Sequence, residues 1–314
     1  MTRPLGVIGV PSSAGAYAPG QEKAPRALRD AGLLAGLRSA GVTVVDHGDS
    51  EVWRWRPDRA RPDAQNLEAV AACAAETAER VRSALVEGEL ALVLGGDCTV
   101  GLGTVAGHLP EEGRLGVIYL DMHGDLNVPA GVRDGALDWM GVAHLLGDED
   151  AAPELRDFGP ATPLLGDDQI VFLAHRRDQS TARELESIER RGLITVPLEA
   201  VGADPAAAAG EALEALAACD RLAVHFDVDC IDFTDAPLSE NTGRNIGLTQ
   251  DAALATLAAV LLDSRVSALT ITELNPDHGA EDGSTLAAFV DRLVPALAAA
   301  PALRQAASGG SSAI

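Results

Sequence analysis

The segment Leu120-Asp121-Met122-His123-Gly124-Asp125-Leu126-Asn127 follows an apolar run that begins at Leu115. A run of this length beside glycine is typical of a buried strand. Asp121, His123 and Asp125 are separated by one residue each, and extended backbone places side chains at that spacing on one face. The segment therefore predicts three possible metal ligands at the end of a buried strand.

A second segment far downstream has the same character. Residues 222–226 form an apolar run, and Asp227, Asp229 and Asp232 follow it. We expect Asp227 and Asp229 to be ligands and Asp232 to support them or to cap the loop. His225 lies inside the run, and we expect it to be a packed, hydrogen-bonded residue of the core. The rest of the chain is then the scaffold that brings the two strand ends together.

Strands and helices alternate along the chain. Apolar runs predict strands at 5–10, 42–45, 90–94, 115–120, 169–173, 194–197, 222–226 and 268–272, and the helical segments between them include 24–37, 65–87 and 250–263. Several strands are continuously apolar, which favours a parallel sheet covered by helices on both faces. We expect His108 and His144 to lie on helix surfaces. The length allows one large α/β domain or two small ones.

Polar clusters follow four of the predicted strands, at Gly95–Thr99, Asp121–Asn127, Asp227–Asp232 and Glu273–Asn275. In an open parallel sheet, ligands bind outside the carboxyl ends of the strands. The clusters therefore predict one composite site. Its candidate metal ligands are Cys98, Asp121, His123, Asp125, Asp227 and Asp229.

Four carboxylates in one place repel one another unless protons or cations compensate their charge. Carboxylates together with one imidazole suit Mn, Mg or Fe(II), and zinc also binds such donors. More than four ligands indicates two ions that share bridging carboxylates. Two such ions acidify a bound water and supply hydroxide at neutral pH. The donor set therefore predicts metal-assisted hydrolysis.

The charge balance excludes some classes of partner. The chain carries 47 acidic and 24 basic residues, a formal net charge of −23, which argues against a nucleic acid or an anionic membrane as partner. An acidic surface serves solubility and also suits a cationic substrate. Four cysteines show no CxxC pairing, no leader-like segment opens the sequence, and no apolar run is long enough to span a membrane. We expect a cytoplasmic protein without disulfides.

Four motifs carry a specific resemblance. Gly-Gly-Asp-Cys-Thr, Asp-Met-His-Gly-Asp-Leu-Asn, Asp-Val-Asp-Cys-Ile-Asp and Glu-Leu-Asn-Pro, in this order, resemble the motifs of the ureohydrolase family, the arginases, agmatinases and their relatives. The resemblance extends from Gly6 to Pro276. It implies an arginase-like fold, a single three-layer α/β domain around a central parallel sheet. We assign residues 1–305 to this domain and 306–314 to a disordered tail.

The resemblance also implies an activity. The family uses two Mn²⁺ ions and a bridging hydroxide to remove urea from a guanidino compound, and it usually assembles as trimers or hexamers. We therefore expect a homotrimer or homohexamer that acts on a small guanidino molecule. The resemblance implies one ion held by Cys98, Asp121, Asp125 and Asp227, and a second ion held by His123, Asp121, Asp227 and Asp229.

Further roles come from the same resemblance. Asp125 would also hydrogen-bond the hydroxide and carry a proton to the leaving amine, and Glu273 would pair with the guanidinium, whose planar fork of donors matches a carboxylate. Asp138 lies where arginases have a proton-shuttling histidine, so we include it among the catalytic residues. We place the substrate beside Asn127, Asp134, His175, Asp178 and Glu273.

Besides Asp138, two further positions depart from the family pattern. Cys98 stands where the family usually has histidine, and a thiolate is a softer ligand that favours Zn, Fe or Co over Mn and can weaken or empty the first metal site. Asp134 corresponds to a residue with which arginases bind the α-carboxylate of their substrate. Two facing carboxylates repel each other, which counts against free arginine as the substrate and favours a guanidine with a neutral or cationic far end.

The sequence leaves several functions open. The first is hydrolysis of a guanidino group, on a substrate other than free arginine, to urea and an amine. A second is the hydrolysis of N-hydroxyarginine in a biosynthetic pathway. A third is a metal-poor, non-catalytic paralogue that serves as a binding or assembly subunit. A fourth is formimino hydrolysis on the same scaffold, which releases formamide instead of urea.

Overall fold

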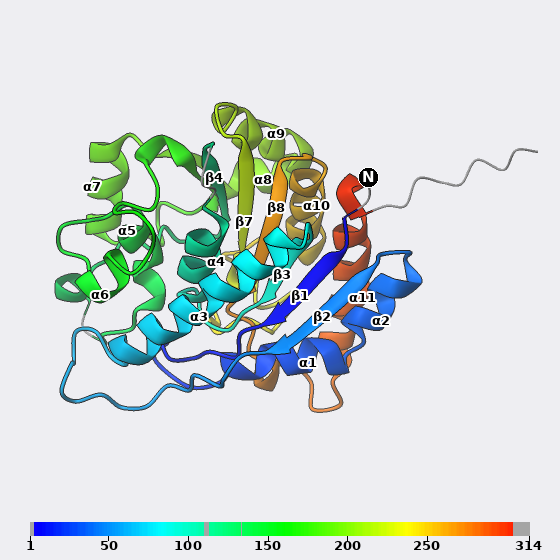
Figure 1. The fold of residues 1–314 in the computed structure, drawn as a ribbon, viewed down its shortest axis with the longest axis horizontal. Helices are drawn as coiled ribbons and strands as arrows, with labels where there is room; N and C mark the ends of the chain where they lie inside the picture. Colours follow the sequence, from blue (N-terminus) through cyan, green and yellow to red (C-terminus); the bar gives the residue numbers. More distant parts are fainter. Residues whose placement is uncertain (1–2, 110–112, 133, 304–314) are drawn as a thin grey trace, which may run out of the picture.

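A computed structural model describes residues 3–109, 113–132 and 134–303, which form a single three-layer domain (Figure 1). Its central sheet has eight strands in the order β2-β1-β3-β8-β7-β4-β5-β6, and every neighbouring pair is parallel. The strands are β1 (Leu5–Gly9), β2 (Val44–Asp49), β3 (Leu90–Leu94), β4 (Leu115–Leu120), β5 (Ile170–His175), β6 (Ile194–Pro197), β7 (Arg221–Asp227) and β8 (Val266–Thr272).

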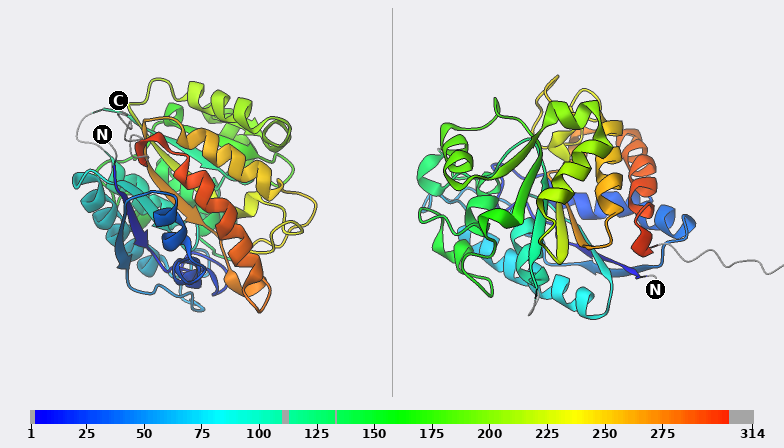
Figure 2. Two further views of the ribbon diagram at one scale, coloured as in Figure 1. Left: turned by 90° about the vertical axis from the view of Figure 1, so that its right-hand side faces the viewer. Right: turned by 90° about the horizontal axis from the view of Figure 1, so that it is seen from above.

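Helices cover both faces of the sheet, as the side view in Figure 2 shows. One face carries α3 (Leu67–Val86), α4 (Val100–His108), α5 (Gly141–Leu145) and α6 (Pro153–Arg156), with α7 (Ala182–Arg191) beside them. The other face carries α1 (Ala24–Asp30), α2 (Leu33–Ser39), α8 (Leu198–Ala203), α9 (Pro205–Ala215), α10 (Gln250–Leu261) and α11 (Ser284–Ala298).

The core is divided into two apolar layers, one on each face of the sheet. Along β3, Leu90, Leu92 and Leu94 join one layer, whereas Ala91 and Val93 join the other. This alternation follows from the two-residue period of a strand. Because both faces are buried, the strands are continuously apolar, which is the pattern that predicted a parallel sheet.

The predicted strands are confirmed, and the differences lie mainly at element boundaries. The predicted helix 24–37 is two helices, because Gly32 adopts a φ of +92° between α1 and α2. The second predicted strand begins at Val44 and extends to Asp49. The predicted tail, 306–314, lies outside the described residues.

Four neighbouring strands of the sheet, β3, β8, β7 and β4, end in the four polar clusters. Parallel strands place their carboxyl ends at one edge of the sheet, so the clusters meet there. Close packing at this edge requires Gly96, where a Cβ atom would lie 1.6 Å from the carbonyl oxygen of Ser12. The sheet topology therefore assembles the composite site that the sequence predicted.

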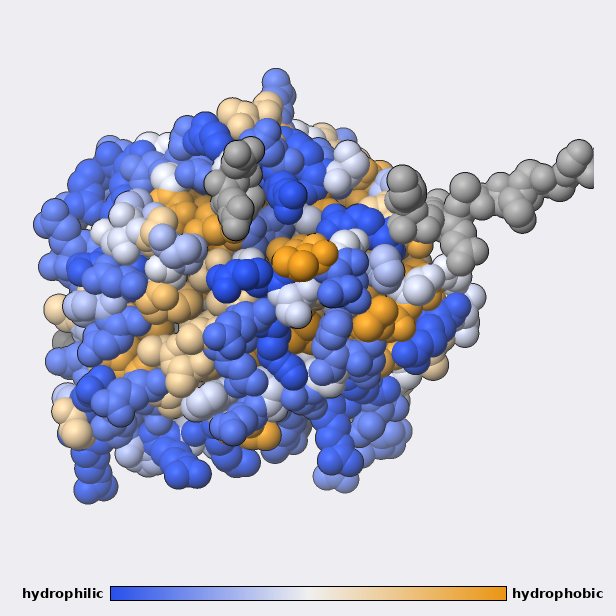
Figure 3. Space-filling view, viewed as in Figure 1, coloured by the Kyte–Doolittle hydropathy of each residue, from blue (hydrophilic) through white to orange (hydrophobic). Residues whose placement is uncertain are grey.

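No helix in the described part of the chain is long and apolar enough to cross a membrane. The face of the molecule shown in Figure 3 is mostly hydrophilic, with apolar side chains in scattered groups. This surface agrees with the acidic composition of the chain.

The expectation that His108 and His144 lie on helix surfaces is wrong, because both side chains are buried. His144 is paired as a neutral ring: Nδ1 donates to the carbonyl oxygen of Met140 at 2.6 Å, and Nε2 accepts from the backbone N–H of Ala152 at 3.2 Å. Burial lowers the pKa of each of the two histidines to about 4.

We predict that acid destabilises the fold partly through His144. An unfolded histidine has a pKa near 6.5, so the unfolded chain takes up the proton first. The stabilisation from the neutral ring is complete above that pH and is lost as the pH falls toward 4. When the pH is lowered from 7 to 4.5, the unfolding free energy of both proteins should decrease. The decrease should be about 2 kcal/mol smaller for His144→Gln than for the parent protein. Urea titrations of both metal-free proteins at the two pH values test this, and equal losses would contradict it.

Candidate metal centre and substrate pocket

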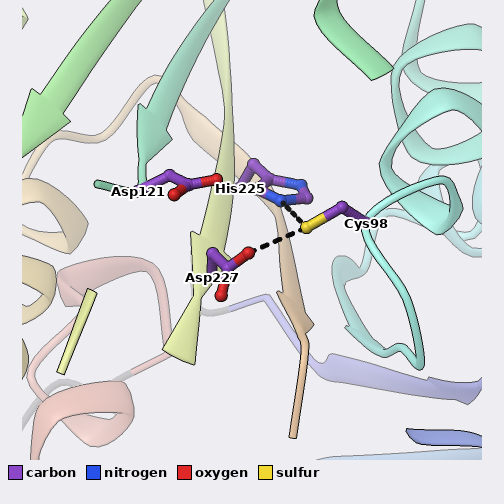
Figure 4. A group of neighbouring side chains, drawn as sticks. All are labelled: Cys98, Asp121, His225 and Asp227. Carbon is purple, nitrogen blue, oxygen red and sulfur yellow. Dashed lines mark hydrogen bonds between the residues drawn. The ribbon is translucent and has the colours of Figure 1, made fainter. Parts of the chain in front are cut away.

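Two groups of possible metal ligands lie at the carboxyl edge of the sheet. In each group the donor atoms lie within 4.8 Å of one another. Asp121 belongs to both groups. The first group contains Cys98, Asp121, His225 and Asp227 (Figure 4), and the second contains Asp121, His123 and Asp229.

Cys98 links the ends of three strands. It follows β3, and its Sγ donates to Oδ2 of Asp227, the last residue of β7, at 2.9 Å. The same sulfur lies 3.2 Å from Nε2 of His225 and 3.3 Å from Oγ1 of Thr272 on β8. The backbone N–H of Cys98 donates to Oε1 of Glu273 at 2.8 Å. Cys98 is therefore fixed in the centre of the site.

The second group is built around His123. Its Nδ1 lies 3.1 Å from Oδ2 of Asp229 and 3.4 Å from Oδ1 of Asp121. Backbone N–H groups hold the carboxylates in place: His123 N donates to Oδ1 of Asp121, and Asp229 N donates to Oδ1 of Asp227, each at 2.7 Å. Both contacts join residues two apart, so the turn at each strand end orients its own aspartate.

The electrostatics of the site reflect crowded negative charge. Burial and the charge of Asp229 raise the pKa of Asp121 to about 6. Burial and the charges of Asp229 and Asp121 raise the pKa of Asp227 well above its usual value. Burial and Asp227 likewise raise the pKa of the Cys98 thiol.

His123 and Asp229 behave differently because they attract each other. Burial alone would lower the pKa of His123, but the charges and hydrogen bonds of Asp229 and Asp121 raise it well above its usual value. Burial would raise the pKa of Asp229, but the charge and hydrogen bond of His123 lower it. In the absence of an ion, a charged imidazole therefore partly neutralises the aspartates.

The residues present fit a pair of divalent ions. Two buried carboxylate oxygens, Oδ2 of Asp121 and Oδ1 of Asp229, have no hydrogen-bond partner among the described residues. Buried oxygens are rarely left unpaired without a reason such as an ion. Carboxylate, imidazole and thiolate groups are all metal donors, and Asp121, common to both groups, can bridge two ions.

Asp125, a predicted ligand, belongs to neither group of closely spaced donors. It has a φ of +48°, and its Oδ2 accepts a hydrogen bond from the hydroxyl of Tyr119. Burial and the charge of Asp121 raise its pKa well above the usual value. Asp125 lines the same pocket as Cys98, His123, Asp227 and Asp229, and its role as a ligand stays a prediction.

A pocket of about 330 Å³ opens above the two groups. Six of its lining residues carry carboxyl groups, and no lysine or arginine is found among the described residues that line it. Trp139 and Tyr17 contribute partly exposed rings. The lining consists of Tyr17, Cys98, His123, Asp125, Asp138, Trp139, Asp227, Asp229, Glu240, Asn241, Thr242 and Glu273.

Glu273 lies on the wall of this pocket, directly after β8. Its φ is +61°, an uncommon conformation for a residue other than glycine, and such strain is often found at functional sites. Its Oε2 accepts a hydrogen bond from Nε2 of Gln21 at 3.1 Å. Burial and the charge of Asp97 raise its pKa well above the usual value. This carboxyl group is held in place by hydrogen bonds, and no lysine or arginine is found among the described residues that line the pocket. It is therefore suited to bind a cation.

Four residues predicted to contact the substrate do not line the pocket. Asn127 is buried and accepts from the hydroxyl of Thr181, and His175 lies 2.9 Å from the hydroxyl of Ser180. Asp178 forms an exposed ion pair with Arg176. Asp134 lines a second hollow, which shares Tyr17 with this pocket. Substrate contacts by these residues stay predictions.

The structure also brings two residues to the site that the sequence reasoning missed. His225 joins the first group of ligands, and Glu240 lines the pocket. One signal for His225 was present in the sequence: His225, Asp227 and Asp229 alternate in the same way as Asp121, His123 and Asp125. No local pattern marks Glu240, because it reaches the site from a loop.

Comparison with known proteins shows to which family the chain is similar. A sequence model of the Arginase family matches residues 3–297. Human Arginase-1 is 30% identical over 284 residues, which cover 88% of this chain and 87% of the human protein. Arginase of Bacillus subtilis (strain 168) is 27% identical over 301 residues, which cover 94% of this chain and 98% of that protein.

Solved structures agree with the sequence comparison. The crystal structure of arginase from Bacillus subtilis has a TM-score of 0.82 at 26% identity, with 94% of this chain and 98% of that chain covered. The structure of formimidoylglutamase from the same species has a TM-score of 0.71 at 19% identity, with 95% and 87% covered, a similarity of fold alone. The chain belongs to the arginase family, whose members are binuclear metal-dependent amidinohydrolases.

We predict that the protein binds two divalent ions per chain and that Asp229→Ala binds one. The substitution removes a ligand of the second group but no apolar packing, so circular dichroism should be unchanged. Turnover should fall by more than about 100-fold, because metal sites are sensitive even to the loss of supporting residues. The exposed Asp30→Ala is the matched control. Metal analysis after gel filtration is the measurement, and two ions retained by Asp229→Ala would remove Asp229 from the ligand set.

Proposed function

We propose that the protein hydrolyses the guanidino group of a small molecule to urea and an amine, and that the substrate is not free arginine. The observation that carries this proposal is the position of Glu273, a buried carboxylate on the wall of an acidic pocket that is also lined by members of both groups of metal ligands. The pocket thus combines a binding group for a planar cation with the donors for two ions. Family membership supports the same class of reaction.

When bound, two divalent ions supply a hydroxide at neutral pH and offset the charge of the aspartates. The chain's own residues position the substrate. Each oxygen of Glu273 accepts one hydrogen bond, from the Cys98 N–H or from Gln21, and a carboxylate can accept more. The remaining lone pairs can receive two N–H donors of a guanidinium side by side.

Protons are needed on the leaving amine, and two pocket carboxyl groups can hold them. Burial and the charges of Glu273 and Asp97 raise the pKa of Asp138 well above its usual value, and the pKa of Asp125 is raised as well. A carboxyl group with a raised pKa keeps a proton closer to neutral pH and can donate it as a general acid. Asp138 at the pocket wall and Asp125 beside the metal ligands are the two candidates for this step.

The far end of the substrate lies near Tyr17, Glu240 and Asp138 in this proposal. Burial and the charge of Glu240 raise the pKa of Tyr17, so its phenol stays protonated as a hydrogen-bond donor. Like charges repel, so Asp138 and Glu240 would repel an α-carboxylate such as that of free arginine. A neutral or cationic far end, as in a simple guanidino amine, suits this wall of the pocket.

N-hydroxyarginine hydrolysis is the second candidate among guanidino reactions, and Cys98 motivates it. Its substrate carries the same α-carboxylate as arginine, so the acidic pocket favours it less. A non-catalytic, metal-poor role is less favoured because unpartnered oxygens remain on Asp121 and Asp229. For formimino hydrolysis, the likeness to formimidoylglutamase is a likeness of fold alone. We further propose two Mn²⁺ or softer divalent ions as cofactors and a homotrimer or homohexamer as the assembly.

The substrate preference can be tested with a panel of guanidines. We predict that the metal-loaded protein releases urea faster from agmatine, guanidinobutyrate amide or a larger guanidino amide than from arginine. Urea, hydroxyurea, formamide and amine products should each be quantified, with N-hydroxyarginine and formiminoglutamate included. Faster turnover of arginine would contradict the selectivity, whereas formamide as the only product would replace urea hydrolysis with formimino hydrolysis. No turnover of any compound by protein that carries both ions would contradict the proposed substrate class.

The role of Glu273 gives a separate prediction. Glu273→Gln keeps the size of the side chain but removes the charge that pairs with the guanidinium. We expect kcat/KM to fall by about 100-fold or more, as when one partner of a buried charge pair is removed, with metal content unchanged. Glu281→Gln, at an exposed position, is the control. Near-normal kcat/KM in Glu273→Gln would show that the guanidinium binds elsewhere.

A further inference from the structure

We propose that His225 is a ligand of the same metal ion as Cys98. This ion would then have one sulfur, one imidazole nitrogen and carboxylate oxygens as donors. The inference rests on the proposed function in one respect, namely that the cluster holds metal ions. It adds to the site a histidine that the sequence placed in the apolar core.

His225 points to the metal side of β7. It precedes Asp227 by two residues, and alternate residues of a strand share one face. Its neighbours on the strand, Val224 and Phe226, belong to the opposite apolar layer. In the sheet it pairs with Tyr119 on β4, which leads into the first aspartate cluster, and with Thr270 on β8.

Packing fixes the orientation of the ring. The ring of Tyr119 stacks on it with centroids 4.2 Å apart and planes 2° apart. Gly101, in the first turn of α4, leaves room at the other nitrogen: a Cβ atom there would lie 2.7 Å from Nδ1. In this orientation Nε2 faces the sulfur of Cys98, as Figure 4 shows. A ligand held in this way needs little reorganisation to bind an ion.

The donor atoms lie at distances suited to one ion. A four-coordinate zinc ion with bonds of about 2.0–2.3 Å has donor atoms about 3.3–3.8 Å apart. Sγ of Cys98 lies 3.2 Å from Nε2 of His225 and 2.9 Å from Oδ2 of Asp227. All four donors of the group, Asp121 included, lie within 4.8 Å of one another. Side-chain shifts of about 1 Å or less would bring them to the separations of a four-coordinate site.

A structural role alone explains His225 less well. Nδ1 has no partner among the described residues in either His225 or His108, so the two buried histidines differ at Nε2. Nε2 of His108 meets the hydroxyl of Ser267 at 2.5 Å, whereas Nε2 of His225 lies beside the sulfur of Cys98 at 3.2 Å and Oγ1 of Thr272 at 3.1 Å. A hydroxyl and a thiol can both turn away to accommodate an ion. The donor composition then favours Zn, Co or Fe(II) over Mn at this site.

The first test uses zinc X-ray absorption on the intact protein. His123→Asn removes the imidazole of the other ligand group, so imidazole scattering around zinc can come from His225 alone within the two groups. With one equivalent of zinc bound, we expect one sulfur neighbour and imidazole scattering. Sulfur without imidazole would overturn the ligand role of His225 while leaving the metal centre intact. No zinc binding by either the parent or the variant protein would overturn both this inference and the proposed metal centre.

The second test measures zinc affinity by competition with a chelating dye. His225→Ala and His225→Gln should each weaken the tighter zinc site by more than about 100-fold, beyond the range typical of a supporting residue. His108→Gln, which also replaces a buried histidine but at the far end of α4, should bind zinc as the parent does. Unchanged affinity in both His225 variants, with normal circular dichroism, would overturn the proposal. The absorption experiment does not depend on whether these variants fold.

Discussion

Buried negative charge is the constraint on which the rest of the structure depends. Asp121, Asp227 and Asp229 are each 5% exposed or less, and they meet at one edge of the sheet. Their mutual repulsion and their burial raise the pKa of Asp121 and Asp227, and only His123 offers a compensating charge within the two groups. Divalent cations relieve this repulsion more completely than one imidazolium can. Such ions also activate water. The buried aspartates, which repel one another in the metal-free protein, are therefore the groups that would hold the ions for hydrolysis.

The architecture explains how such an unfavourable cluster is maintained. Two apolar layers hold the sheet from both faces, and the order of the strands places β3, β8, β7 and β4 side by side. The free energy of that core offsets the local cost at the strand ends. Asp125 and Glu273, both with positive φ, lie where the chain leaves β4 and β8. Both residues line the pocket, and uncommon backbone conformations of this kind are often found at functional sites.

Much of this arrangement could be predicted from the sequence because it depends on periodic patterns. Continuous apolar runs predict a buried parallel sheet, and polar residues directly after four of them predict one edge with ligands. Local sequence also sets two helix starts: Thr181 and Glu184 form a capping box at α7, and the side chain of Asp204 caps α9. Five of the predicted ligands come together because β3, β7 and β4, at whose ends they lie, are close together in the sheet. These ligands are Cys98, Asp121, His123, Asp227 and Asp229.

Residues on long loops could not be placed in this way. Asp134 and Asp178 lie outside the pocket, whereas Tyr17 and Glu240 line it. No periodic pattern in the sequence separates the loop residues that line the pocket from those that do not. His225 was misjudged for another reason: an imidazole inside an apolar strand has the pattern of a core residue. Its surroundings, with Cys98 from the β3 end and Asp121 from the β4 end, exist only after the sheet has formed.

Anomalous diffraction from crystals grown with zinc is the most direct measurement of the central claim, that two metal sites share a carboxylate at this sheet edge. Data collected on both sides of the zinc absorption edge locate each ion. We predict one zinc peak beside Cys98 and His225 and a second beside His123 and Asp229, with Asp121 in reach of both. No peak at either group, or a peak at one group alone, would contradict the claim.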